Sequence, residues 1–225
     1  MAASASNPSQ LIEVSERAWE AVTPTIKAKL LWSDPMTKRR AQLTRFEPGA
    51  VLPMHKHNGD ELLYVIEGEI TDEAGTVYAG SVGYRPDGCA HSVTSKNGAT
   101  VFAIITGGVE PATAAADPKS RIIVLSELQW NSPMPGVSMK AFWEDAATKR
   151  RAVLARFDAG AKLPLHKHVG DELVFMIEGS NYDEFNEIRV GNLNYRPNGC
   201  THTVSSKHGA VAIAYVTGGV EMIKH

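Results

Sequence analysis

The chain is an internal repeat, and this constrains its fold more than any other feature of the sequence. Residues 12–110 align with residues 123–221 at a constant offset of 111 without a gap, and 50 of the 99 aligned pairs are identical. A unit of about 100 residues is large enough to bury its own core. The repeat therefore predicts a first domain over residues 12–110, an Ala- and Pro-rich linker over 111–120, and a second domain over 121–225.

Composition and charge exclude several classes of protein. The chain is 43% hydrophobic with a formal net charge of −2, and its Lys and Arg residues are dispersed, so nucleic acid is not an expected ligand. We find no apolar run long enough for a signal core or a membrane span. The two cysteines, Cys89 and Cys200, occupy equivalent repeat positions, which argues against a disulfide framework and favours a cytoplasmic location.

The pattern of short segments predicts an all-β fold. Short apolar or alternating runs are separated every 8 to 12 residues by turn signals such as EPG, NGDE and PDG, which is typical of an antiparallel sandwich or barrel. A brief helical turn is expected only near residues 15–22. A barrel is favoured because HKHNGDELLYVIEG predicts two strands folded across a tight Asn58-Gly59 turn. Val169-Gly170 replaces this turn in the second repeat, so Gly59 and Gly170 are expected to supply the positive φ.

Each repeat also carries the ligand set of a metal site. Side chains two residues apart on a strand share a face, so His55 and His57 are expected to lie side by side. Glu61 follows the predicted turn, and His91 must come from another part of the barrel. Three imidazoles and one carboxylate form a nitrogen and oxygen site suited to a divalent first-row metal. The predicted metal ligands are His55, His57, Glu61 and His91, with His166, His168, Glu172 and His202 in the second repeat.

A lone histidine is more often a hydrogen-bonded side chain of a barrel wall than a ligand. The same four ligand types occur at matching positions in both halves, which favours metal binding. An alternative is a metal ion that only stabilises each barrel.

The motifs around these residues resemble both motifs of the cupin superfamily. They are Gly49-x5-His55-x-His57-x3-Glu61-x6-Gly68 and Gly80-x5-Pro86-x-Gly88-x2-His91, and residues 160–179 and 191–202 repeat them. The resemblance implies a bicupin, two tandem double-stranded β-helix (jelly-roll) barrels with one metal ion each. Ser95 and Ser206 depart from the Asn that often closes the second motif, but that Asn is not a ligand.

Within the superfamily, the runs RFEPGA, HKH, EGEITDEAGTVYAGS and YRPDGCAH are similar to the cupin module of ChrR-type anti-sigma factors, a group that also resembles small cupin dioxygenases. ChrR-type regulators hold their sigma factor with a separate N-terminal zinc-binding helical domain. Only about a dozen residues precede the first cupin unit here, so direct sigma-factor inhibition is not expected.

The number of ligands limits the chemistry. Zinc prefers four ligands, the number in each predicted set, so a zinc ion would be nearly filled and would favour a structural or sensing role. Iron, manganese or nickel take six and would leave room for a substrate or dioxygen. Three functions stay open: a dioxygenase-like oxidoreductase acting on a small oxygenated carbon compound, a ChrR-like metal or oxidant sensor that acts through a partner, and a metal-stabilised binding module without turnover. A small-molecule ligand is expected, and both a monomer and a homodimer remain open.

Other candidates have simpler explanations. Leu63 and Val65 lie two and four residues after Glu61, so their side chains are expected on the same face of the strand. Val174 and Met176 have the same spacing from Glu172, which predicts an apolar wall beside each metal. Six side chains could bind an anionic substrate group, but pairing with surface acidic groups or shaping a turn is the simpler explanation; they are Arg45, Tyr84, Arg85, Arg156, Tyr195 and Arg196. Cys89 and Cys200 could report oxidants, but a small buried side chain is the simpler interpretation.

Overall fold

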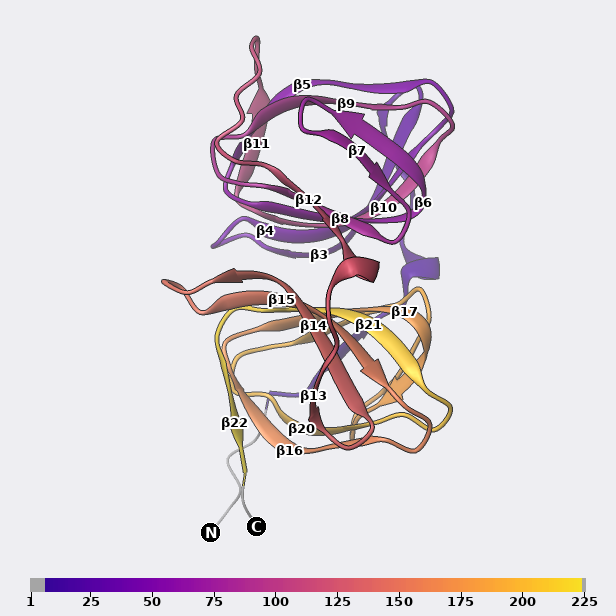
Figure 1. The fold of residues 1–225 in the computed structure, drawn as a ribbon, viewed down its shortest axis with the longest axis vertical. Helices are drawn as coiled ribbons and strands as arrows, with labels where there is room; N and C mark the ends of the chain where they lie inside the picture. Colours follow the sequence, from indigo (N-terminus) through magenta and orange to yellow (C-terminus); the bar gives the residue numbers. More distant parts are fainter. Residues whose placement is uncertain (1–6, 224–225) are drawn as a thin grey trace. The chain divides into compact units, whose positions relative to one another are not determined.

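The computed structural model describes residues 7–223 and is built almost entirely of antiparallel strands (Figure 1). The chain forms two compact units. One unit, the first barrel, comprises Ser15–Glu127. The other, the second barrel, comprises the N-terminal segment up to Val14 and the chain from Leu128 onward. No helix in residues 7–223 is both long and apolar enough to cross a membrane.

Each barrel contains an 11-stranded sheet that curls around a closed interior. The strands of the first barrel are β2 (Glu20–Thr23), β3 (Ile26–Asp34), β4 (Arg39–Phe46), β5 (Ala50–Asn58), β6 (Glu61–Asp72), β7 (Gly75–Tyr78), β8 (Ser81–Arg85), β9 (Ala90–Ser95), β10 (Ala99–Thr106), β11 (Gly108–Pro111) and β12 (Arg121–Val124). The main path of this sheet runs β11-β5-β9-β6-β10-β4-β3-β2, with β7, β8 and β12 attached to it.

The second barrel repeats this arrangement. Its strands are β1 (Gln10–Ile12), β13 (Asn131–Met134), β14 (Val137–Asp145), β15 (Arg150–Phe157), β16 (Lys162–Val169), β17 (Glu172–Tyr182), β18 (Glu187–Arg189), β19 (Leu193–Arg196), β20 (Thr201–Ser205), β21 (Ala210–Val216) and β22 (Gly219–Met222). Two short 3-10 turns, η1 (Val14–Glu16) and η2 (Leu125–Glu127), complete the elements. η1 overlaps the start of the segment for which a helical turn is expected, and β2 occupies its end.

The compact units do not begin and end where the sequence repeats do. β12 lies at the start of the second repeat, but it pairs with β8 of the first barrel. β1 lies at the start of the first repeat, but it pairs with β19 of the second barrel. Residues 111–120, expected to be a linker, also contact the first barrel, because Ala116 forms a β-bridge with Ala90. That residues 12–110 and 121–225 form two domains, each folding on its own, remains a prediction.

The hairpin predicted across Asn58-Gly59 is wrong, although a sharp turn is present. β5 pairs with β9 and β11, whereas β6 pairs with β7, β8, β9 and β10, so the two strands do not pair with each other. The backbone at Asp60 instead exchanges hydrogen bonds with Thr106 at the end of β10. Gly59 and Gly170 have φ of +144° and +131°, as predicted. A Cβ at Gly59 would lie 1.4 Å from the carbonyl oxygen of Thr106.

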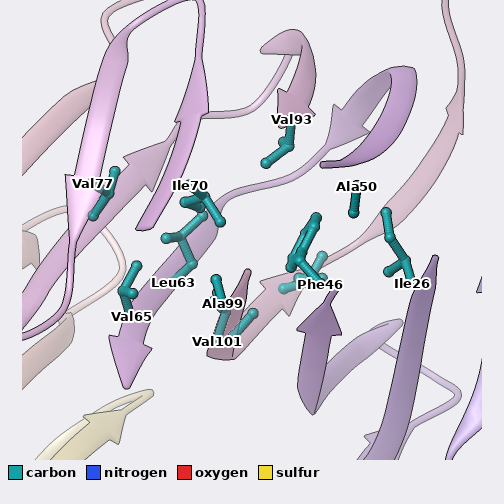
Figure 2. Close-up of a cluster of buried hydrophobic side chains, with 12 residues drawn as sticks. Ile26, Phe46, Ala50, Leu63, Val65, Ile70, Val77, Val93, Ala99 and Val101 are labelled. Carbon is teal, nitrogen blue, oxygen red and sulfur yellow. The ribbon is translucent and has the colours of Figure 1, made fainter. Parts of the chain in front are cut away.

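Alternating side chains fill each interior with an apolar core. The core of the first barrel consists of Ile26, Phe46, Ala50, Leu63, Val65, Ile70, Val77, Val93, Ala99, Val101, Ala103 and Ile105, most of them labelled in Figure 2. The second core is equivalent and contains Val137, Ala155, Phe157, Ala161, Val174, Met176, Ile188, Val204, Ala210, Ala212 and Ala214. The rigid walls so formed carry the polar side chains that make the candidate metal centres.

Candidate metal centres

Three imidazoles converge in each barrel. The two groups are His55, His57 and His91 in the first barrel, and His166, His168 and His202 in the second. Within each group, one ring nitrogen from every histidine lies within 4.8 Å of those of the other two. The six histidines predicted from the repeat therefore come together in threes.

The strands explain this convergence. His55 and His57 lie two residues apart on β5, so their side chains leave the strand on the same side. On the neighbouring β9, His91 is directly opposite His55. His166 on β16 and His202 on β20 are opposed in the same way. Directly opposed residues of an antiparallel pair have Cβ atoms roughly 5 Å apart, which allows their rings to meet.

A carboxylate approaches each triad from the first residue of the next strand. Glu61 begins β6, and its Oε2 lies 3.5 Å from Nε2 of His57. Glu172 begins β17, and its Oε2 lies 3.4 Å from Nε2 of His168. The predicted glutamates thus lie beside the imidazoles, although they arrive from a strand that does not pair with the one carrying the His-x-His run.

Hydrogen bonds fix the orientation of two rings in the first barrel. Nδ1 of His55 lies 2.9 Å from the carbonyl oxygen of Pro53, and Nδ1 of His91 lies 2.8 Å from Oδ2 of Asp72. A carbonyl and a carboxylate only accept, so both Nδ1 atoms carry hydrogen and both Nε2 atoms present lone pairs. Nε2 of His91 lies 3.1 Å from Nε2 of His57.

The second barrel has the same orientation, with an equivalent partner for His166 and a different partner for His202. Nδ1 of His166 donates to the carbonyl oxygen of Pro164 at 2.8 Å, and Nδ1 of His202 donates to that of Thr203 at 3.0 Å. Nε2 of His202 lies 2.9 Å from Nε2 of His168.

These donors fit a divalent first-row cation. Burial lowers the pKa of the His57 and His168 imidazoles and brings the pKa of His202 to about 3, so the rings stay neutral at physiological pH. Neutral nitrogens with inward lone pairs, next to a carboxylate, are the groups that such metals bind.

The two centres differ in what supports them. In the first barrel, Oδ2 of the buried Asp72 accepts from Nδ1 of His91 at 2.8 Å and from Nε of Arg85 at 2.6 Å. Burial opposes the charge of this carboxylate, but the two donors outweigh it and lower its pKa. A carboxylate behind a metal-binding histidine fixes its ring and raises its basicity.

In the second barrel the equivalent carboxylate, Asp183, forms no hydrogen bond with His202, whose Nδ1 donates to Thr203. Asp183 accepts instead from Arg196 at 3.1 Å and from Oγ of Ser9 at 2.8 Å. Arg196 also donates from Nη1 to Oε2 of Glu172 at 2.8 Å. Burial opposes ionisation of Glu172, but the charge of Arg196 outweighs it and brings the pKa of Glu172 to about 2. Glu172 is therefore held by an arginine that its counterpart Glu61 lacks as a hydrogen-bond partner.

A cavity of about 90 Å³ adjoins the triad of the first barrel. His55, Glu61 and His91 contribute to its lining, and the rest of the wall is mainly apolar. Leu63 belongs to this wall, as predicted, whereas Val65 lies in the surrounding core. Phe46, Leu63, Ile70, Val93 and Val101, all of them lining residues, converge in Figure 2. Pockets for drug-sized ligands occupy roughly 300–1,000 Å³, so this one suits a smaller molecule.

The predicted alternatives for anion binding pair with internal groups. Arg85 bonds to Asp72, and Tyr84 donates to Asp60 at 3.0 Å. Arg45 lies over the ring of Trp19. The equivalents behave alike: Tyr195 donates to Asp171, Arg196 pairs with Glu172 and Asp183, and Arg156 lies over Trp130.

The cysteines do not have the environment of reactive thiols. Cys89 and Cys200 are buried, at 2% and 0% exposure. Burial raises the pKa of Cys89 and brings the pKa of Cys200 to about 11, so neither forms a thiolate readily.

Two groups of residues near the centres were not predicted from the sequence. Asp72 and Asp183 are the first, and their identity at equivalent positions was the available signal. Gln42 and Thr44, which line the cavity, are the second. The repeat gives no signal for them because the second barrel has Val153 and Ala155 there.

Comparison with known proteins agrees with this geometry. A family model described as the ChrR cupin-like domain matches residues 7–109 and again residues 119–221. The chain belongs to the ChrR cupin-like family. Each match includes one complete triad and its glutamate, so this bicupin has one candidate metal centre per cupin domain. No curated protein matches the chain.

Solved structures share the fold at low identity. A candidate dioxygenase from Nostoc punctiforme has a TM-score of 0.82 at 14% identity, covering 97% of this chain and 87% of its own. Oxalate decarboxylase from Bacillus subtilis, in a study of its Mn(II) centres, has a TM-score of 0.71 at 16% identity, covering 99% and 81%. These similarities show the bicupin fold.

Proposed function

We propose that this bicupin is a metal-dependent oxidoreductase, dioxygenase-like, that acts on a small oxygenated carbon compound. The observation that carries the proposal is the cavity of the first barrel, which joins His55, Glu61 and His91 to an apolar wall. A ligand in this cavity would have its oxygen atoms beside the metal and its carbon atoms against the wall. The candidate dioxygenase and the oxalate decarboxylase with Mn(II) centres among the structural neighbours support a catalytic role for such a centre.

We further propose that each ion is held by three imidazoles and the adjacent carboxylate. The residues are His55, His57, Glu61 and His91 in the first barrel and His166, His168, Glu172 and His202 in the second. Iron, manganese or nickel would keep positions open for a ligand, whereas zinc would be nearly saturated. A bound metal would supply Lewis-acid activation of the ligand oxygens. The protein groups orient the ligand and exclude water from the reacting end.

Metal analysis followed by oxygen uptake tests this proposal. The protein is purified without chelators and without air, its metals are quantified, and oxygen consumption is measured with a panel of diketones and hydroxyketones. Iron with substrate-dependent uptake is the expected result. Firmly held zinc in both centres with no uptake would refute it. The His57→Ala and His168→Ala variants, which each remove one ligand from one centre, assign any activity to a barrel.

Family membership favours a second candidate, a ChrR-like metal or oxidant sensor that acts through a partner. The buried, weakly acidic cysteines argue against sensing by a thiol, so a sensor would have to respond through the metal. Retention of one zinc ion per barrel, with release on treatment with peroxide and no turnover, would select this function over the enzyme.

A further inference from the structure

The first cavity carries a directional chain of hydrogen bonds on one wall. Arg40, Gln42 and Thr44 alternate along β4, so their side chains lie on one face of the strand. Nε of Arg40 donates to Oε1 of Gln42 at 3.2 Å, and Nε2 of Gln42 donates to Oγ1 of Thr44 at 3.1 Å. Gln42 and Thr44 both line the cavity.

The direction of this chain is fixed by Arg40. A guanidinium can only donate, so Gln42 must turn its carbonyl oxygen toward Arg40 and its amide hydrogens toward Thr44. The hydroxyl oxygen of Thr44 is then an acceptor, and its own hydrogen stays available. Among residues 7–223, no acceptor for that hydrogen occurs. The wall therefore offers the cavity a hydrogen-bond donor, and an apolar ligand group would leave that donor unsatisfied.

The strand register separates this donor from the metal ligands. Glu61, Ile105 and Arg40 form one row across β6, β10 and β4. Gln42 lies one row further along the same strands and Thr44 two rows further. Each row adds roughly 7 Å of strand length. A ligand whose oxygens are at the metal can thus meet the donor only with its opposite end.

The second barrel lacks this wall. Val153 and Ala155 occupy the positions of Gln42 and Thr44, although Arg151 still matches Arg40. The polar group there is on a different strand, since Asn181 of β17 takes the position of the cavity-lining Ile70.

We propose that the first barrel selects ligands with an acceptor oxygen at the end remote from the metal, through the Thr44 hydroxyl oriented by Gln42 and Arg40, and that the second barrel does not. The proposal rests on the proposed function and specifies its substrate as bifunctional, with oxygens at both ends. Thr44 and Gln42 are then residues that determine specificity.

Ligand titration of the cobalt(II)-loaded full chain tests this inference. The His168→Ala variant restricts cobalt to the first barrel, and His57→Ala restricts it to the second. The probes are two matched pairs whose chains are long enough to approach the row of Thr44 while the 2-oxo acid end is at the metal, 6-hydroxy-2-oxohexanoate against 2-oxohexanoate and 7-hydroxy-2-oxoheptanoate against 2-oxoheptanoate. Both members of a pair chelate through the same oxygens and differ only in the terminal hydroxyl. Dissociation constants come from changes in the visible spectrum of the cobalt ion.

The first barrel is expected to bind the hydroxylated member of at least one pair about 3- to 10-fold more tightly, and the second barrel to show no preference. Thr44→Val should abolish the preference without weakening binding of the unhydroxylated probe, and Thr44→Ser should retain it. In the second barrel, the double variant Val153→Gln/Ala155→Thr should introduce a preference.

Three results would overturn the inference. Equal binding within both pairs by the first barrel, or an unchanged preference in Thr44→Val, refutes the specificity alone. A cobalt spectrum that responds to none of the four probes also refutes the inference, and a spectrum that responds to no diketone or hydroxyketone either refutes the small-molecule function proposed above.

Discussion

The Asp72→Asn substitution should weaken metal binding in the first barrel by about 10- to 100-fold, the usual effect of removing the carboxylate behind a metal-binding histidine. Asp72 contacts Nδ1 of His91 at 2.8 Å and Nε of Arg85 at 2.6 Å, and all three side chains are buried. The amide keeps the shape but removes the charge. It also leaves the Arg85 guanidinium without its carboxylate partner, which should reduce the free energy of unfolding by about 3–5 kcal/mol.

The second barrel provides a matched control. Asp183 is the equivalent residue, but it forms no hydrogen bond with His202, whose Nδ1 donates to the carbonyl oxygen of Thr203. Arg196 would also keep Glu172 as a partner after Asp183→Asn. We therefore expect this variant to lose stability with a much smaller loss of metal affinity.

Competition with a chromophoric chelator measures the affinity of each centre, in chains that carry His168→Ala or His57→Ala to isolate one barrel. Urea unfolding of the metal-free forms measures the stability. Equal losses of affinity in Asp72→Asn and Asp183→Asn, or an unchanged affinity in Asp72→Asn, would refute the role assigned to the contact between Asp72 and His91.

Three further predictions concern pH, the thiols and the turns. His202 has a pKa of about 3 in the folded protein against about 6.5 for an imidazole in an unfolded chain, so the unfolded chain binds its proton first as the pH falls. Protonation of His202 should not affect the free energy of unfolding of the metal-free protein above pH 6.5, and it should lower that free energy by up to about 1.4 kcal/mol per pH unit below pH 6.5. Denaturation curves of the His202→Gln variant should lack this pH-dependent loss. Cys89 and Cys200 should not react with a disulfide reagent at pH 7.5 until the protein unfolds; rapid labelling of the native state would contradict their burial. Gly68→Ala should destabilise the protein more than Gly49→Ala, which should cost about 1–2 kcal/mol in urea unfolding. Both glycines have positive φ, but only at Gly68 would the new Cβ meet a backbone oxygen, 1.9 Å away; equal losses would exclude the clash.

The parts of the fold that depend on local pattern were predictable from the sequence. Alternating apolar residues and turn residues indicated the all-β class, and the constant offset of 111 residues indicated two copies of the same fold. The His-x-His spacing indicated that His55 and His57 share a face, because parity along one strand is independent of how strands pair. The repeat then assigned the same property to His166 and His168.

Strand pairing was not predictable in the same way. The Asn58-Gly59 turn has the composition of a hairpin, but hydrogen bonds between Asp60 and Thr106 direct β6 to a different neighbour. Those bonds join residues 46 positions apart, and no local pattern reveals them. The roles of Asp72 and Thr44 were hidden for the same reason, since each depends on a contact or cavity formed by several strands.

The exchange of short strands has a consequence for a single repeat. β1 begins the first repeat but completes the second barrel, and β12 begins the second repeat but completes the first. A polypeptide containing one repeat alone would therefore have a donor strand with no site of its own and an acceptor edge at β8 or β19. Two such polypeptides could satisfy each other by reciprocal donation, so an isolated half should assemble as a swapped homodimer. Gene fusion of an ancestral dimer of that kind would give the connectivity seen here.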